Sequence, residues 1–223
     1  MQISFTTQYL ILITLKEMND MEITMLTSPE VQNGQAMTPD RYLAMERNGI
    51  REFQGKYELF NQKIRFMAGA SQAHNTISGN ILTLLKMFIW QQNLTAYVNQ
   101  SDMKVISFLN YKNYFYPDIV FAEGELIYGD THKDILTNPT LLIEVLSDET
   151  ESFDRGDKFH SYRQIESLRE YFLVSQYEKK IEQFYKNADG EWVVGAVFTE
   201  GVLPLRSLSF SMNLGQIYRQ VAV

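Results

Sequence analysis

The chain has 223 residues, of which 45% are hydrophobic and 13% aromatic, so it can fold as one sizeable domain with a packed core. It contains no cysteine, which excludes disulfides and thiolate metal sites. The formal net charge of −7 provides no overall attraction for nucleic-acid phosphates, so DNA binding would require a local basic surface.

Residues 1–35 are predicted to be a leader that is either disordered or the product of a mis-assigned start, and residues 36–223 are predicted to be the domain. The apolar run at 9–13 is too short to span a bilayer, and no basic residue precedes it as in a signal peptide. Met21 and Met25 are alternative starts. We therefore expect a cytoplasmic protein with no membrane partner.

The first half of the domain is predicted to contain two helices and a hairpin. Thr38 and Pro39 indicate the start of one helix. The runs at 57–60 and 63–67 indicate a hairpin. Ser71 is the predicted N-cap of the longest helix, whose apolar residues recur at three- and four-residue steps: Ile77, Ile81, Leu84, Leu85 and Phe88.

The second half is predicted to be mostly strands, with a loop over 124–139 and one helix over about 155–167. The predicted strands are 95–99, 103–108, 116–122, 140–146, 170–174, 180–186 and 191–198. This order predicts an α/β (α+β mixed sheet) domain. Its central sheet would be flanked by helices, with an N-terminal helix and hairpin and a C-terminal β-meander.

Two predicted core strands contain carboxylates. Glu144 lies within the apolar run 141–146, and Asp118 lies within the apolar stretch 116–121. Because an unpaired buried charge is costly, such acids are usually paired or bound to a metal. Hard oxygen ligands on adjacent strands suit Mg²⁺ or Mn²⁺, which would activate water for attack on a phosphodiester. The alternative is a pair of salt-bridged or edge-exposed acids.

Lys158 is placed by helical periodicity on the same face as Tyr162 and Ile165, the face expected to pack on the sheet. There it could orient an attacking water or stabilise charge on a phosphate. The alternative is a surface lysine whose ammonium snorkels to the edge. His74 has no zinc-type partner spacing, so it is either a capping or core residue or a member of the site.

Several segments together resemble one protein family. They are KYELFNQKIRFMAGASQAHNTISGNI, SDMKV, YFYPDIVF and LLIEVLSDETESFDRGDKFHSYRQIESLREYFLV, in that order. The sequence resembles the Uma-two family of the PD-(D/E)XK restriction endonuclease-like superfamily, over about residues 37–218. The resemblance implies a restriction endonuclease-like core and a DNA endonuclease activity that depends on Mg²⁺, with Mn²⁺ as the alternative cofactor.

The resemblance also implies site residues. Asp118 and Glu144 would be the metal ligands and, with Lys158, the catalytic residues. The motif lysine normally stands two residues after the glutamate, where this chain has Leu146. Glu58 and His74 would support the site with Tyr162, and Lys104 is a rival for the basic role.

One departure from the family weakens the expectation of activity. The family commonly has Asp-Gly-Glu after Tyr-Glu-Leu, whereas this chain has Asn61, Gln62 and Lys63, which would remove two acids near the site. The alternative function is therefore a catalytically inactive module for nucleic-acid or protein interaction. An RNA-directed nuclease is not separated from a DNA-directed one by sequence, and a homodimer is possible.

Overall fold

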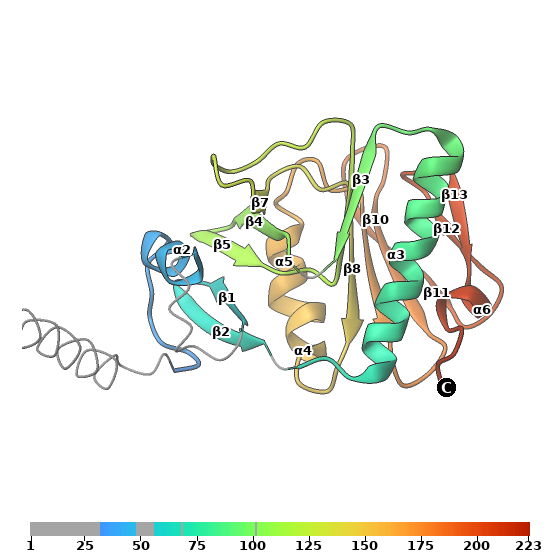
Figure 1. The fold of residues 1–223 in the computed structure, drawn as a ribbon, viewed down its shortest axis with the longest axis horizontal. Helices are drawn as coiled ribbons and strands as arrows, with labels where there is room; N and C mark the ends of the chain where they lie inside the picture. Colours follow the sequence, from blue (N-terminus) through green and yellow to red (C-terminus); the bar gives the residue numbers. More distant parts are fainter. Residues whose placement is uncertain (1–31, 48–55, 68, 101) are drawn as a thin grey trace, which may run out of the picture.

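A mixed six-stranded sheet forms the centre of the molecule (Figure 1). The computed structural model describes residues 32–47, 56–67, 69–100 and 102–223. The strand order is β11-β10-β9-β8-β6-β3, and only β8 and β9 pair in parallel. The bounds are β3 (Ala96–Gln100), β6 (Ile119–Glu123), β8 (Leu141–Leu146), β9 (Glu170–Ser175), β10 (Ile181–Lys186) and β11 (Trp192–Phe198).

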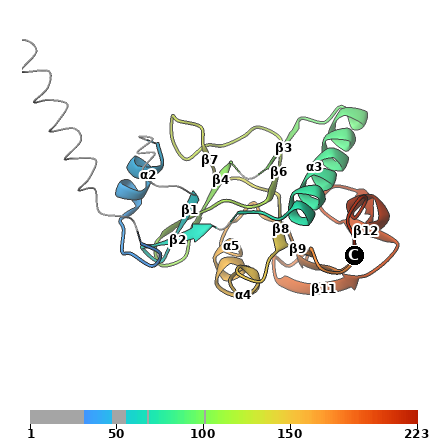
Figure 2. The ribbon, with the colours of Figure 1, turned by 60° about the horizontal axis from the view of Figure 1, so that its bottom comes forward.

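A five-stranded sheet lies beside the first, and both views show it next to helix α2 (Pro39–Arg47) (Figures 1 and 2). Its order is β2-β1-β5-β4-β7, with bounds β1 (Lys56–Phe60), β2 (Lys63–Met67), β4 (Lys104–Phe108), β5 (Lys112–Phe115) and β7 (Ile135–Leu136). Strands β12 (Val202–Leu205) and β13 (Phe210–Asn213) form a separate hairpin.

Helix α3 (Gln72–Gln92) covers one face of the six-stranded sheet, together with the β12–β13 hairpin and helix α6 (Leu214–Ile217). It begins where Ser71 Oγ accepts a hydrogen bond from the His74 amide at 3.0 Å, the N-cap predicted from the sequence. Its apolar residues pack with alternate residues of β6, β8 and β9. No helix in the described ranges is long and apolar enough to cross a membrane.

The opposite face is covered by a short helical run, α4 (Glu151–Phe153), η1 (Asp154–Lys158) and α5 (Phe159–Tyr162). The middle segment η1 is a π-helix, a geometry that often occurs at functional sites. The core beneath it also contains Val105 and Phe115, so the apolar cluster joins the two sheets and the helical run.

The α+β class, the central sheet flanked by helices, the N-terminal hairpin and the C-terminal meander are all confirmed. Several local predictions were wrong. Strands β5, β12 and β13 were missed, and the predicted loop over 124–139 contains β7. The helix predicted over 155–167 spans 151–162, and Asp118 precedes β6 rather than lying within a strand. Gln35 already hydrogen-bonds to β2 through Ile64; the leader prediction over 1–31 lies outside the described residues.

An ion-pair network ties α2 to the segment before β7. The Arg47 guanidinium contacts Asp130 and Asp134 at 2.6 Å each, and Lys104 Nζ donates to Asp134 Oδ2 at 3.0 Å. Burial alone would raise the pKa of Asp134, but the hydrogen bonds from Arg47 and Lys104 outweigh it and lower that pKa to about 2. The ionised carboxylate therefore stabilises the folded protein.

We predict that Asp134→Asn lowers the free energy of unfolding by about 1–3 kcal/mol at pH 7, the range for hydrogen bonds to charged groups. Because the folded-state pKa is depressed, this contribution is present above the unfolded pKa of about 4 and is lost as pH falls toward about 2. Urea unfolding of both proteins across this pH range measures it. A stability difference that did not shrink on acidification would contradict the assignment.

Candidate active site

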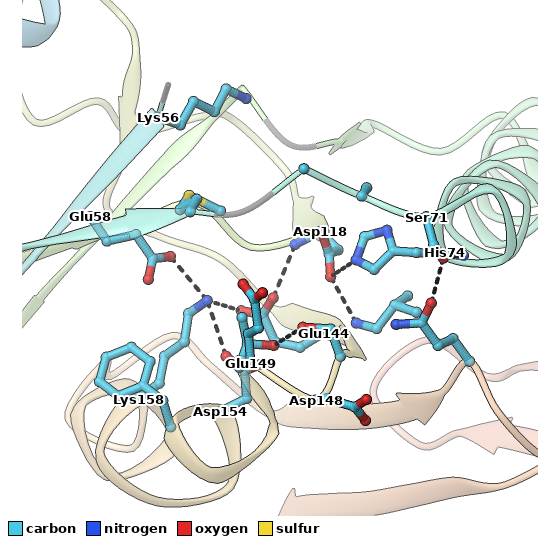
Figure 3. A pocket seen from close by; sticks show the side chains of 18 of the residues that line it. Lys56, Glu58, Ser71, His74, Asp118, Glu144, Asp148, Glu149, Asp154 and Lys158 are labelled. Atoms are coloured by element: carbon cyan, nitrogen blue, oxygen red, sulfur yellow. Dashed lines mark hydrogen bonds and ion pairs between the residues drawn. The ribbon is translucent and has the colours of Figure 1, made fainter. Parts of the chain in front are cut away.

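A hollow of about 700 Å³ opens between the two sheets, near the end of β8. It is lined by residues from β1, β2, the start of α3, the end of β8 and the helical run α4–η1 (Figure 3). The charged side chains that face it include Glu58, His74, Asp118, Glu144, Asp154 and Lys158.

Glu144 lies at the centre of β8 with 3% of its surface exposed. Its side chain points to the same face as Leu142 and Leu146, which pack in the cluster beneath the helical run. Tyr162 Oη donates to Glu144 Oε1 at 3.0 Å. Burial raises the pKa of Glu144, and the nearby carboxylates of Asp154, Asp118 and Glu58 add to that rise, while Lys158 opposes it.

Lys158 supplies the positive charge that this face of β8 requires. Its Nζ lies 2.9 Å from Glu144 Oε1, 3.0 Å from Glu58 Oε1 and 3.3 Å from Asp154 Oδ1 (Figure 3). Burial alone would lower the pKa of Lys158, but the carboxylates around it outweigh burial and raise that pKa. The lysine is therefore a buried, charged group rather than a surface lysine that snorkels to the edge.

Glu58 links this charge cluster to the five-stranded sheet. It lies on β1, is 3% exposed, and its Oε1 accepts a hydrogen bond from the Tyr116 amide at 2.9 Å. Burial raises the pKa of Glu58, and the Lys158 ammonium is the main opposing effect. The cluster thus contains three carboxylates and one lysine within the part of the chain that the structure describes.

Asp118 stands beside Glu144 because β6 and β8 pair with Ile119 opposite Ile143. The Asp118 amide donates to Glu144 Oε2 at 3.2 Å, and the Val145 amide donates to Asp118 Oδ2 at 2.8 Å. His74 Nε2 lies 3.0 Å from the same Oδ2, and its buried Nδ1 has no hydrogen-bond partner among the described residues. The two acids therefore converge as predicted, with Glu144 on β8 and Asp118 just before β6.

The donor set of this hollow fits a hard divalent cation. Asp118 Oδ1 accepts no hydrogen bond from any described residue, and its side chain is 14% exposed at the hollow. No group of three His, Asp or Glu side chains within the described segments is arranged as a complete metal site. Mg²⁺ is commonly bound by one or two carboxylates and keeps several waters, so Asp118 and Glu144 would be enough protein ligands for it.

The structure brings six of the seven predicted site residues to this hollow or directly against it: Asp118, Glu144, Lys158, Glu58, His74 and Tyr162. Lys104 is the exception. It is 5% exposed, and its ammonium binds Asp134 and lies 5.1 Å from the ring centroid of Tyr116. Its positive charge therefore belongs to the α2 network.

The sequence did not single out Asp154 as a partner of Lys158, because it is one of several acids between residues 148 and 157. Its position four residues before Lys158 was the available signal, since such pairs are neighbours on a helix. Residues 61–63, which depart from the family pattern, do not lie at the hollow in the structure. Asn61 and Gln62 form the β1–β2 turn with φ of 48° and 59°, and neither they nor Lys63 line the hollow.

The sequence matches a known family over residues 39–216, which is most of the chain. That family, Uma2, is described as "Putative restriction endonuclease". The chain belongs to the Uma2 family. Uma2 is the Uma-two family that the sequence segments resemble, so the predicted membership is confirmed.

Two cyanobacterial proteins from Synechocystis sp. (strain PCC 6803) resemble this Uma2 protein. "Uncharacterized protein slr1290" is 33% identical over 186 residues, covering 83% of this chain and 93% of its own. "Uncharacterized protein sll1609" is 32% identical over 164 residues, covering 74% of this chain and 89% of its own.

A crystal structure described as "a putative nuclease belonging to DUF820" from Anabaena variabilis aligns with a TM-score of 0.62 and 15% identity. It covers 82% of this chain and 97% of its own, which shows a shared restriction endonuclease-like fold.

We predict that Lys158→Met destabilises the protein by about 3–5 kcal/mol, because it leaves Glu58, Glu144 and Asp154 buried without a counter-charge. Denaturant unfolding measures the change. The control is Lys86→Met on the exposed side of α3, which should change stability by less than about 0.5 kcal/mol. Equal losses of stability in the two variants would show that the Lys158 ion pairs do not stabilise the buried carboxylates.

Proposed function

We propose that this Uma2 protein is a divalent-metal-dependent endonuclease that hydrolyses phosphodiester bonds in DNA. The observation that supports this most directly is the placement of Asp118 and Glu144 side by side at the hollow, with Lys158 bound to Glu144. The family description, "Putative restriction endonuclease", supports the same chemistry. The proposal includes Mg²⁺ or Mn²⁺ as cofactor and a cytoplasmic location.

In this proposal Asp118 and Glu144 hold the divalent cation through their carboxylate oxygens. The cation, when bound, would lower the pKa of water and polarise a phosphoryl oxygen. Val145 and His74 fix the Asp118 carboxylate by binding its Oδ2, which leaves Oδ1 directed to the hollow. Tyr162 donates to Glu144 Oε1 and the Asp118 amide donates to Glu144 Oε2, so both oxygens of that carboxylate are held in place. Burial keeps the pKa of Tyr162 high, so its hydroxyl remains a donor.

Lys158 is proposed to donate a hydrogen bond to the attacking water or to an oxygen of the scissile phosphate. Its ammonium already contacts Glu144, so it lies directly beside the proposed ligand. A lysine held by carboxylates remains charged, which favours a role as donor and electrostatic stabiliser over a role as general base.

The wall of the hollow also offers a positive side chain for the substrate backbone. Arg65 lies directly opposite Glu58 in the β1–β2 pairing, and its guanidinium carbon lies 4.0 Å from the ring centroid of Phe153. No ion pair joins Arg65 to an acid within the described ranges, so its charge is available to a phosphate. Cleavage of both strands of a duplex often uses a two-fold pair of sites, and a homodimer would supply them.

We predict that the purified protein cleaves DNA in Mg²⁺ or Mn²⁺ and that EDTA abolishes cleavage. Glu144→Gln and Asp118→Asn should each slow cleavage by more than about 100-fold, since even outer-sphere partners of metal ligands cost 10–100-fold. Calorimetry with Mn²⁺ should show binding heat that both substitutions remove. The matched control is Glu200→Gln, an exposed carboxylate away from the hollow, which should retain both cleavage and heat.

The alternative, a catalytically inactive interaction module, predicts a different pattern from the same experiment. Neither DNA nor RNA would be cleaved in either metal, and Mn²⁺ would give no heat that depends on Glu144. Cleavage of RNA alone with the same metal and residue dependence would support the nuclease chemistry and overturn DNA as the substrate.

We further predict that Lys158→Met separates metal binding from cleavage. The two proposed ligands remain, so Mn²⁺ binding should persist or tighten as a competing positive charge is removed. Cleavage should fall by more than about 100-fold, comparable to the loss of one preorganised transition-state donor. Both are measured below the melting temperature of the variant, with Lys86→Met as control. Wild-type cleavage by Lys158→Met would exclude Lys158 from the chemistry.

A further inference from the structure

A second hollow, of about 550 Å³, lies at the opposite end of the central sheet from the candidate active site. It is formed where β8 and β9 begin and β10 ends, and Thr140, Glu170 and Lys186 line it. The active-site hollow instead uses the later part of β8 and the residues that follow it. The two hollows share no lining residue.

Two cations are held side by side in this second hollow. The Lys186 amide donates to the Arg169 carbonyl oxygen at 2.8 Å, which makes the two residues cross-strand neighbours. Lys186 Nζ donates to the Ile165 and Glu166 carbonyl oxygens at 3.3 and 3.2 Å, and Arg169 Nη1 donates to the Glu166 carbonyl oxygen at 2.7 Å. Burial and the positive charge of Arg169 lower the pKa of Lys186.

A third cation, Arg206, reaches the hollow from the segment after β12. Its guanidinium carbon lies 4.2 Å from the ring centroid of Tyr185, and no described residue accepts a hydrogen bond from the guanidinium. None of these cations makes an ion pair with a carboxylate in the described part of the chain. Like charges held together without a direct ion pair to a carboxylate provide a favourable place for an anion.

The carboxylates at this hollow leave that positive charge only partly compensated. Glu123 and Glu170 line it, and Glu166 is the acid that partly opposes the fall in the pKa of Lys186. Glu170 is 1% exposed, and its oxygens accept hydrogen bonds from the Arg206 and Ser207 amides and the Gln183 side chain. That carboxylate is therefore saturated by the protein itself and anchors the segment that carries Arg206.

We propose that this second hollow binds a phosphate group through Arg169, Lys186 and Arg206. Guanidinium groups donate paired, parallel hydrogen bonds that match phosphate oxygens, and a lysine adds a compact charge. The site is separate from the candidate active site and does not rest on the proposed nuclease function. The phosphate group belongs either to a free or small phosphorylated molecule or to a nucleic-acid backbone.

The first test compares thermal unfolding of the full chain in phosphate and in chloride at equal ionic strength, with EDTA present. At about tenfold over its Kd, phosphate should raise the Tm by roughly 3 °C relative to chloride. The double variant Arg169→Gln/Lys186→Gln should lose this difference. The control Lys86→Gln/Lys179→Gln removes the same charge from exposed positions and should keep it.

Because each difference is taken within one protein, a general loss of stability does not imitate the result. Should the double variant fail to fold, the single variant Arg206→Gln replaces it, because the Arg206 side chain is exposed. Calorimetry with inorganic phosphate then compares phosphate binding by this variant and by the wild type. A phosphate effect that is absent in the wild type, or equal in the site and control variants, would overturn the proposal. The Arg65→Gln variant should retain the effect, which separates this site from the active-site hollow.

A second arm identifies the source of the phosphate. Fluorescence anisotropy with a short oligonucleotide in EDTA gives the dependence of log K on log salt, whose slope falls by about 0.7–0.9 for each phosphate contact removed. A smaller slope in Arg169→Gln/Lys186→Gln assigns a nucleic-acid backbone. An unchanged slope, together with loss of the phosphate effect on Tm, assigns a small phosphorylated molecule.

Discussion

The charge balance around Lys158 is the interaction on which the rest of the site depends. One ammonium is shared by Glu58 from the five-stranded sheet, Glu144 from the six-stranded sheet and Asp154 from the helical run. These ion pairs therefore connect all three layers, and none of the four side chains is more than 4% exposed. Because removing charges from water costs about as much as their attraction returns, the surrounding aromatic packing must supply the net stability. The ion pairs fix geometry.

The pairing of β6 with β8 fixes the two proposed ligands independently of any bound ion. With Ile119 opposite Ile143, the Asp118 amide reaches Glu144 and the Val145 amide reaches Asp118. Each carboxylate thus uses one oxygen to accept a hydrogen bond from a backbone amide. This preorganisation lowers the conformational entropy that would be lost when both carboxylates bind one ligand. The same register explains why Asp118 lies beside Glu144 although it precedes β6.

Strong local patterns made much of the fold predictable from sequence. The hairpin, the Ser71-capped helix and the glutamate-bearing strand were all found because apolar periodicity and capping residues are local signals. Strand β5 was missed because it has four residues and begins with Lys112 and Asn113. The contact between Glu58 and Lys158 joins residues 100 positions apart, so periodicity could place each on a face but could not bring them together. The choice between Lys104 and Lys158 depended on the same long-range information.

Lys158 lies on the helical run, and its surroundings there differ from those that a lysine on β8 would have. A lysine two residues after Glu144 would replace Leu146, which is 3% exposed and packs in the apolar cluster beneath the helical run. An ammonium at that position would have to be desolvated among apolar side chains, whereas Lys158 reaches Glu144 from the helical run and contacts Glu58 and Asp154 as well. The π-helical turn between Asp154 and Lys158 places both side chains at the same end of the cluster. Glu58 and Asp154 therefore join Glu144 in compensating the burial of Lys158.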